Sequence, residues 1–106
     1  MNVEDMLEEA NTLNSDGAIS EQDMFDYFEV VFSAFDVHLD RERIRKGLWK
    51  KYNALDQVHP VRVKTDRIMR SLEGTPTQEQ IDNAVEELYD IINYANFAVR
   101  ILQHKV

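Results

Sequence analysis

One stretch near the C-terminus constrains the fold more than any other part of the chain. From Thr75 to about Gln103, apolar residues recur at alternating steps of three and four: Ile81, Ala84, Leu88, Ile91, Ala95, Ala98 and Leu102. This spacing predicts one long helix with a core-facing stripe. Three more apolar residues widen the stripe on one shoulder: Val85, Ile92 and Val99. Polar residues follow the other shoulder: Asn83, Glu87, Asp90 and Tyr94.

The composition extends this helical prediction to the whole chain. Of its 106 residues, 43% are hydrophobic and 30% are charged, which is typical of a folded domain. Three glycines and two prolines leave little material for the turns that many short strands would need. We therefore expect a single all-α domain over residues 1–106, a bundle of four or five helices with a long C-terminal helix.

Several classes of protein are disfavoured by the sequence. The chain has no cysteine, which rules out disulfides and cysteine-ligated zinc. No apolar run approaches the roughly 20 residues of a membrane helix, so no membrane association is expected. The N-terminus lacks the basic start and apolar run of a signal peptide, which favours a cytoplasmic protein. The formal net charge of −8 argues against a nucleic-acid partner, because phosphate neutralisation needs a basic surface.

The charges are distributed unevenly along this acidic chain. Up to Asp36 there are ten acidic residues and no lysine or arginine, whereas ten basic residues lie between Arg41 and Arg70. One interpretation is that acidic and basic helices pack side by side and neutralise one another. The other is a basic surface facing a carboxylate surface, which would suit an anion that arrives with a metal.

The first two predicted helices are separated by a polar loop. The first runs from Val3 to about Thr12, and the second from Ser20 to about Asp36, with Ser20 as its N-cap and Asp23 in the reciprocal capping position. The loop Thr12–Asp23 resembles an EF-hand in part, but Thr12 stands where a carboxylate is expected and Asp23 replaces the bidentate glutamate. Weak calcium binding through Asn14, Asp16 and Asp23 is therefore a third, minor functional option.

Two more helices are expected before the C-terminal one. A break at His38 and Leu39 would precede a helix capped by Asp40 that continues to Leu55. Pro60 restrains the residue before it, so a loop over residues 57–60 would end that helix and Pro60 would open the next. Gly74 suits a left-handed C-cap, and the long helix would begin with Thr75 as N-cap and Pro76 in its first turn.

The polar border of the long helix offers the best candidate for chemistry. Glu87 and Asp90 are three residues apart, which puts both carboxylates on one helix face. Magnesium prefers oxygen ligands of this kind, so the pair is a candidate for metal binding and catalysis. Asp26 and Glu29 have the same spacing and are candidates for a second ligand pair. A solvated acidic face would produce the same patterns.

Other polar residues could complete a binding site beside this pair. Lys64 and Arg67 stand together on one stripe of the fourth predicted helix. Asn93 and Tyr94 follow Asp90 by about one turn and could orient water or a ligand.

These motifs resemble the C-terminal half of the nucleotide modification associated domain family and, more distantly, the all-α nucleotide pyrophosphatases of the MazG type. The resemblance covers roughly Trp49 to Leu102 and rests on two short motifs. These are K-x-x-R-I, with Lys64, Arg67 and Ile68, and E-x-x-D-x-x-N-Y, with Glu87, Asp90, Asn93 and Tyr94.

The resemblance implies a helical domain that binds a nucleoside triphosphate through Mg²⁺ and, in catalytic members, hydrolyses it to a monophosphate and pyrophosphate. Glu87 and Asp90 would then be metal ligands, and Lys64 and Arg67 would hold phosphate. This chain lacks the E-E-x-x-E ligand set of the MazG type and the D-Y-G element of the related family.

The leading functional prediction is a MazG-like nucleotide-binding protein, with pyrophosphohydrolase activity as its catalytic form. The alternative is a non-enzymatic acidic helical module for protein–protein interaction. A homodimer is expected in either case, because a long, richly apolar helix in a small domain needs a partner.

Overall fold

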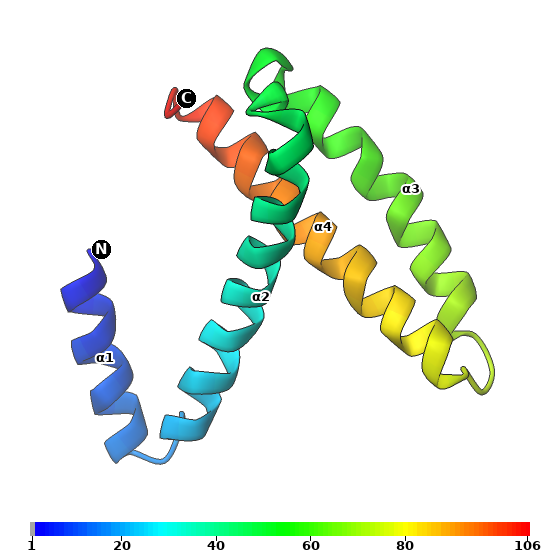
Figure 1. Cartoon of the computed structure of the whole chain (residues 1–106). Coiled ribbons are helices and arrows are strands. Elements are labelled where there is room, and N and C mark those ends of the chain that lie inside the picture. The colour runs from blue at the N-terminus through cyan, green and yellow to red at the C-terminus, as the bar shows by residue number, and fades with distance from the viewer. Residues whose placement is uncertain (1) are drawn as a thin grey trace. The chain divides into compact units, whose positions relative to one another are not determined.

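The computed structural model describes residues 2–106, which form four α-helices and one short 3-10 helix (Figure 1). The elements are α1 (Val3–Ser15), α2 (Glu21–Arg45), η1 (Leu48–Lys51), α3 (Ala54–Leu72) and α4 (Gln78–Leu102). No strand occurs in this part of the chain. The expected all-α class with a long C-terminal helix is confirmed. Among the described helices, none combines the length and apolar character that a membrane span requires.

The chain divides into two compact units, and the boundary falls inside α2. The first unit ends at Val31, and the second comprises Phe32–Val106. The first contains α1 and the beginning of α2, whereas the second contains the rest of α2, η1, α3 and α4. That residues 1–106 form one domain stays a prediction.

In the first unit, both helix starts are stabilised by side-chain caps. Asn2 accepts a hydrogen bond from the backbone N–H of Asp5 at 2.8 Å, and α1 continues to Ser15, one turn beyond the expected end. At the start of α2, the Asp23 N–H donates to Ser20 Oγ and the Ser20 N–H donates to Asp23 Oδ2. The predicted Ser20–Asp23 capping box is therefore present.

This local structure changes the interpretation of the EF-hand-like segment. Thr12 and Asn14 lie within α1, so only residues 16–20 connect the two helices. Asp23 is already hydrogen-bonded to Ser20. The hydrogen bond with the Ser20 hydroxyl has the larger effect and that with the Ser20 backbone N–H the smaller, and both lower the pKa of the Asp23 carboxyl group. A twelve-residue calcium loop is thus not formed by this segment.

The expected break at His38 and Leu39 does not occur, because α2 continues to Arg45. Neither residue removes a backbone hydrogen bond or requires a special dihedral angle, so the helix passes through them. The chain reverses instead at Lys46 and Gly47, both of which have positive φ. The Gly47 N–H donates to the Glu42 carboxylate, which helps to close the end of α2.

The expected start of α3 at Pro60 is also wrong, since α3 begins at Ala54 and carries Pro60 inside it. Asn53 and Asp56 form a reciprocal capping box that starts the helix earlier. Pro60 removes the one backbone hydrogen bond that its N–H would have donated near this end. The local cap therefore outweighs the proline signal.

The start of α4 is two residues later than expected, because Thr77 rather than Thr75 is the N-cap. The Thr77 side chain accepts from the Gln80 N–H, and the Gln80 side chain accepts from the Thr77 N–H. This capping box outcompetes the Thr75–Pro76 start. Gly74 has the expected left-handed conformation, with φ of +70°.

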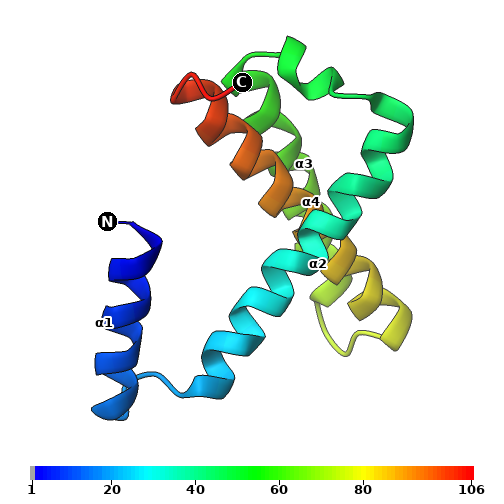
Figure 2. The same cartoon turned by 60° about the vertical axis from the view of Figure 1, so that its left-hand side comes forward.

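The second unit is built on an antiparallel pair of helices, α3 and α4, which lie side by side in Figures 1 and 2. The C-terminal part of α2 crosses α4. The buried apolar residues come from every element of the unit: Ala34, Trp49, Ile68, Ala84, Phe97 and Ala98. The Trp49 and Phe97 rings stack with centroids 4.4 Å apart, and buried Gln57 donates to the Trp49 carbonyl at 3.0 Å.

The apolar stripe of α4 is buried only in part. Ala84 and Ala98 are buried. Four members of the expected core-facing stripe are exposed instead: Ile81, Leu88, Ala95 and Leu102. Two residues of its shoulder, Val85 and Val99, are exposed as well. The described core therefore covers one side of the stripe and leaves the other in water.

Candidate functional site

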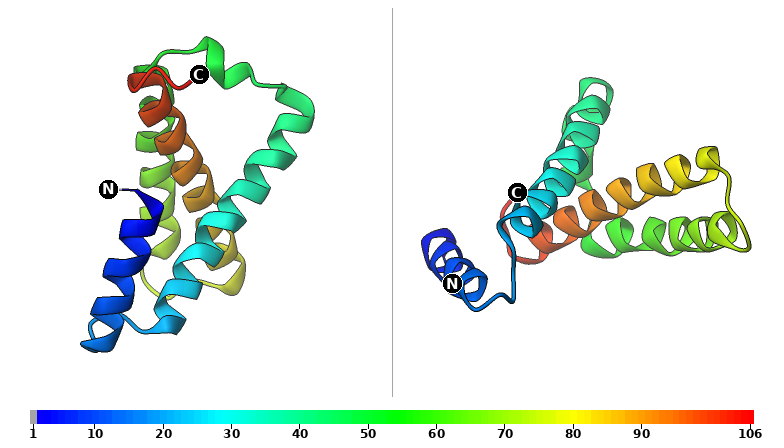
Figure 3. Two further views of the ribbon diagram at one scale, coloured as in Figure 1. Left: turned by 90° about the vertical axis from the view of Figure 1, so that its left-hand side faces the viewer. Right: turned by 90° about the horizontal axis from the view of Figure 1, so that it is seen from below.

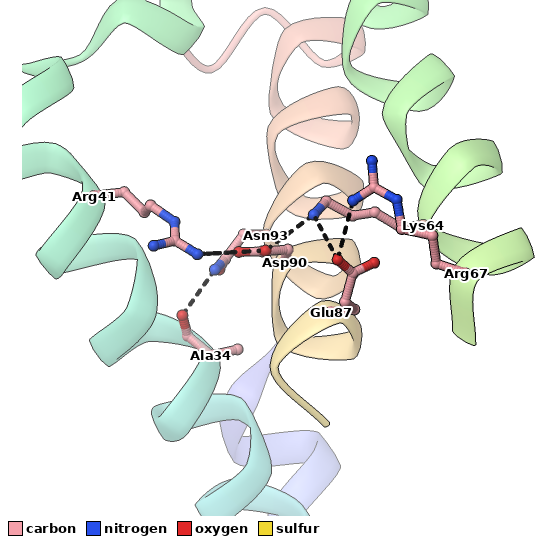
Figure 4. A network of polar contacts seen from close by, with 7 residues as sticks. All are labelled: Ala34, Arg41, Lys64, Arg67, Glu87, Asp90 and Asn93. Atoms are coloured by element: carbon pink, nitrogen blue, oxygen red, sulfur yellow. Dashed lines mark hydrogen bonds and ion pairs between the residues drawn. The ribbon is translucent and has the colours of Figure 1, made fainter. Parts of the chain in front are cut away.

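Five charged side chains from three helices form a continuous network in the second unit (Figure 4). Lys64 of α3 lies between the two carboxylates of α4, with its Nζ 3.1 Å from Asp90 Oδ2 and 3.8 Å from Glu87 Oε1. Arg67 Nη1 is 3.2 Å from Glu87 Oε1. Arg41 of α2 reaches Asp90 from the other side, at 3.5 Å.

The centre of this network is shielded from water and its ends are open. The side chains of Lys64 and Asp90 are each 16% exposed and that of Glu87 is 23% exposed, whereas Arg67 and Arg41 are 60% and 45% exposed. The Lys64–Asp90 contact is thus the electrostatically strongest, because screening by water is weakest there. The two arginines are the cations that an incoming anion can reach most easily.

One carboxylate oxygen in the network has no partner. Glu87 Oε2 is buried and receives no hydrogen bond within the described residues, although Oε1 of the same group contacts Lys64 and Arg67. A buried acceptor without a donor costs free energy. Glu87 therefore has capacity left for a proton, a water molecule or a cation.

The two polar residues that follow Asp90 have different surroundings. Asn93 Nδ2 donates to the backbone carbonyl of Ala34 at 2.8 Å, so this amide ties α4 to α2 (Figure 4). Tyr94 packs edge-on against Phe97, with ring centroids 6.3 Å apart. Asn93 thus has a structural role in addition to its position at a cavity.

Two cavities meet at the network. The larger, about 470 Å³, is lined by aromatic residues as well as by charged ones. Its aromatic side includes His38, Trp49, Tyr52 and Tyr94, and its cations are Arg41, Arg45 and Lys64. The smaller, about 410 Å³, is lined by Arg67, Asn83 and Glu87 among others. Arg41, Lys64 and Asp90 line both cavities.

The structure thus brings six of the predicted site residues together: Lys64, Arg67, Glu87, Asp90, Asn93 and Tyr94. The sequence interpretation missed Arg41 and Arg45, because it placed a helix break at His38 and Leu39. In the structure, α2 carries both arginines on the same helix as Ala34, which Asn93 contacts. A correct prediction of the length of α2 would have placed both arginines on the helix that meets α4.

The second predicted acid pair belongs to the other unit. Asp26 accepts a hydrogen bond from Gln22 at 2.8 Å within α2, and both Asp26 and Glu29 are exposed. Their role as metal ligands stays a prediction. Among residues 2–106, no group of three or more histidine, aspartate or glutamate side chains is arranged to hold a metal ion.

The donor set of the network suits a magnesium ion only when a phosphate accompanies it. Two carboxylates face three cations, so the negative charge of the pair is already more than balanced. Mg²⁺ typically binds through one or two carboxylates, several waters and substrate phosphates. Glu87, with its unpartnered oxygen, and Asp90 fit that arrangement, since a phosphate would occupy the cations that now hold them.

Comparisons with protein families, with characterised proteins and with solved structures find no match to this chain. The functional interpretation therefore rests on the residues of the site and on the short motifs noted above.

Proposed function

We propose that this protein binds a nucleoside triphosphate together with Mg²⁺ in the larger cavity of its second unit. The observation that supports this most directly is the combination, in one cavity, of an aromatic side with Arg41, Arg45 and Lys64. A base needs flat apolar surface and a polyphosphate needs cations, and a volume of about 470 Å³ lies within the usual range for small-molecule sites.

Phosphate binding begins at Arg41 in this proposal. Its contact with Asp90 is the longest of the arginine contacts in the network, at 3.5 Å, and its side chain is nearly half exposed. A phosphate oxygen offers a guanidinium a stronger, bidentate partner. Lys64 follows, because it lines the same cavity and its ammonium can contact a phosphate as a point charge.

Engagement of these cations frees the carboxylates that they now hold. Asp90 loses Arg41 and part of its contact with Lys64, and Glu87 keeps its unpartnered oxygen. Both can then hold the magnesium ion that accompanies the nucleotide. When bound, that ion supplies neutralisation of the charge that develops on the polyphosphate.

In the catalytic form of the proposal, the reaction is hydrolysis of the bond between the α and β phosphates. Water adds to the α phosphorus, the bridging P–O bond breaks, and a monophosphate and pyrophosphate leave. Where Asp90 alone holds the ion, the unpartnered oxygen of Glu87 would instead accept the proton that water releases. Nucleoside triphosphates are intracellular, so the proposal assigns the protein to the cytoplasm, and it includes a homodimer as the working form.

Calorimetric titration of the full chain tests this proposal. A nucleoside triphosphate should bind with Mg²⁺ at least about tenfold more tightly than without it. Asp90→Asn with Glu87→Gln should abolish this magnesium-dependent gain and leave metal-free binding unchanged or stronger, because two competing carboxylates are gone. Lys64→Met should weaken binding in both conditions.

Matched variants separate the site from general charge effects. Glu79→Gln removes a carboxylate from the first turn of the same helix, outside the network, and should leave both affinities unchanged. Asp26→Asn with Glu29→Gln tests whether the second predicted pair, in the first unit, also binds metal; an unchanged magnesium gain would refute that prediction. Release of pyrophosphate distinguishes catalysis from binding. An affinity that is indifferent to Mg²⁺ and to Lys64→Met would refute the site.

A second candidate function is protein–protein interaction without catalysis, and one observation favours it. Many large apolar side chains of the described residues are exposed, including Phe25, Ile44 and Leu55 at more than 60% each. Surfaces of this kind mark interaction sites. Under this alternative the charge network only ties α2, α3 and α4 together, and nucleotides would not bind.

A further inference from the structure

The side of α4 that faces away from the charge network carries an exposed apolar stripe. Its residues recur at steps of four and three over three heptads: Ile81, Val85, Leu88, Ile92, Ala95, Val99 and Leu102. The large residues measured as exposed on it, five of the seven, keep between 38% and 69% of their surface in water. The buried residues Ala84 and Ala98 lie on a neighbouring line of the same helix.

The stripe has the residue pattern of a two-helix seam. Val85, Ile92 and Val99 are β-branched and recur every seven residues, and the positions between them include Leu88 and Leu102. β-branched residues at one heptad position and leucine at the other favour pairing of two helices. Ala95, in the middle of the second set, would allow two backbones to approach closely.

The border of the stripe permits contact between identical copies. On the side away from α3, the residues beside it are Asp82, Tyr89, Asn96 and Gln103. Only one of the four is charged, so two copies of this acidic chain could meet here with little repulsion. The α2-facing side of α4, with Glu87 and Asp90, would not allow this.

The face is large enough for a specific dimer. The stripe from Ile81 to Leu102 is about 32 Å long and the α3–α4 pair about 20 Å wide, which gives a footprint of about 640 Å². This is at the lower end of the range for specific interfaces, about 600 Å² from each partner. Exposed residues of α3 within this width lie on the side of Ile68 opposite to Lys64 and Arg67: Val58, Met69 and Leu72. In the right-hand view of Figure 3, α3 and α4 run side by side.

From these observations we infer that α4 is the seam of a homodimer, in which the stripe from Ile81 to Leu102 packs against the same stripe of a second copy. The inference rests on the homodimer proposed above but not on nucleotide binding. The alternative occupant is α1 of the same chain. At thirteen residues, or about 20 Å, α1 is too short to cover a stripe of about 32 Å.

Sedimentation equilibrium of the full chain provides the first test. We expect a dimer for the natural sequence, and Leu88→Glu should raise its Kd at least about 100-fold, because each dimer would bury two unpaired charges. Ile44→Glu is the matched control, since this α2 residue is 86% exposed and lies outside the stripe. It should leave the dimer Kd unchanged. Circular dichroism verifies that each variant remains helical.

Single cysteines provide a second test that does not disturb the fold, because the chain has no cysteine of its own. Under oxidation, Ile92→Cys or Ala95→Cys should cross-link two chains, whereas Glu86→Cys, on another side of α4, should not. If Leu88→Glu leaves the dimer Kd unchanged and neither stripe cysteine cross-links, the protein is a dimer but α4 is not its seam. A monomer at every concentration would overturn both, and calorimetry would still decide nucleotide binding.

Discussion

Two acid pairs with the same spacing have different surroundings in this protein. Glu87 and Asp90 on α4 face Lys64 and Arg67 of α3 and Arg41 of α2. Asp26 and Glu29 on α2 are exposed, and Asp26 is bonded only to Gln22 of its own helix among the described contacts. A spacing of three places two carboxylates on one helix face. Which cations meet that face depends on other helices.

The comparison also separates two ways in which a carboxylate contributes to the fold. The pair on α4 connects three helices, and its central contact is shielded from water. The pair on α2 acts within a single helix at the surface. Contacts of the first kind should contribute measurably to stability, whereas exposed groups of the second kind usually contribute little.

The largest expected effect is from Asp90→Ala. It removes the nearest carboxylate from Lys64, which is 16% exposed, and should lower the free energy of unfolding by about 2–3 kcal/mol. The matched change Asp26→Ala should alter it by less than about 0.5 kcal/mol. Urea denaturation followed by circular dichroism measures both values. Equal losses for the two variants would remove the distinction between the pairs.

A smaller effect should distinguish the two cations that contact Glu87. Arg67 is 60% exposed, so Arg67→Met should cost no more than about 1 kcal/mol, and added salt should reduce that cost. Lys64→Met should cost more, because it leaves two partly buried carboxylates with fewer partners. Denaturation at low and high ionic strength provides the measurement. A greater loss from Arg67→Met would contradict the order of burial.

The smallest effect concerns Asp23, a carboxylate whose partner lies in the same helical turn. Hydrogen bonds with Ser20 lower its pKa below the ordinary value of 3.8. Its contribution should therefore be fully present above about pH 4 and be lost as the pH falls through the lowered pKa. In Ser20→Ala, NMR titration of the Asp23 carboxyl should show a midpoint that rises toward the ordinary value without reaching it, because the backbone N–H of residue 20 still donates to the carboxylate. An unchanged midpoint would mean that the Ser20 hydroxyl is not a cause.

Much of the fold could be predicted because helix-forming information is local. The periodicity of α4 and the Ser20–Asp23 cap depend on residues only a few positions apart, and both predictions are confirmed. Two of the boundary errors arose where two local signals competed. Pro60 and the Asn53–Asp56 cap both occur near the start of α3, and the cap determined the boundary. At the start of α4, Thr77 with Gln80 prevailed over Thr75 with Pro76.

The candidate site could be predicted only in part, for a different physical reason. Sequence motifs selected Glu87, Asp90, Lys64 and Arg67, and these residues do meet. Arg41 was missed, because its approach to Asp90 depends on α2 continuing past His38 and crossing α4. No spacing within α2 encodes that crossing.

By itself the sequence determined the helical class, the amphipathic character of α4 and the shared face of Glu87 and Asp90, since these follow from the period of the helix. Only the tertiary structure decided which side of α4 would be covered. Ala84 and Ala98 are buried, Glu87 and Asp90 meet the cations of α2 and α3, and Leu88 and Val99 stay exposed. The helix period shows which residues share a face, but it does not show which face another helix covers. Contact with a neighbouring helix is therefore needed to distinguish the buried side of α4 from its exposed side.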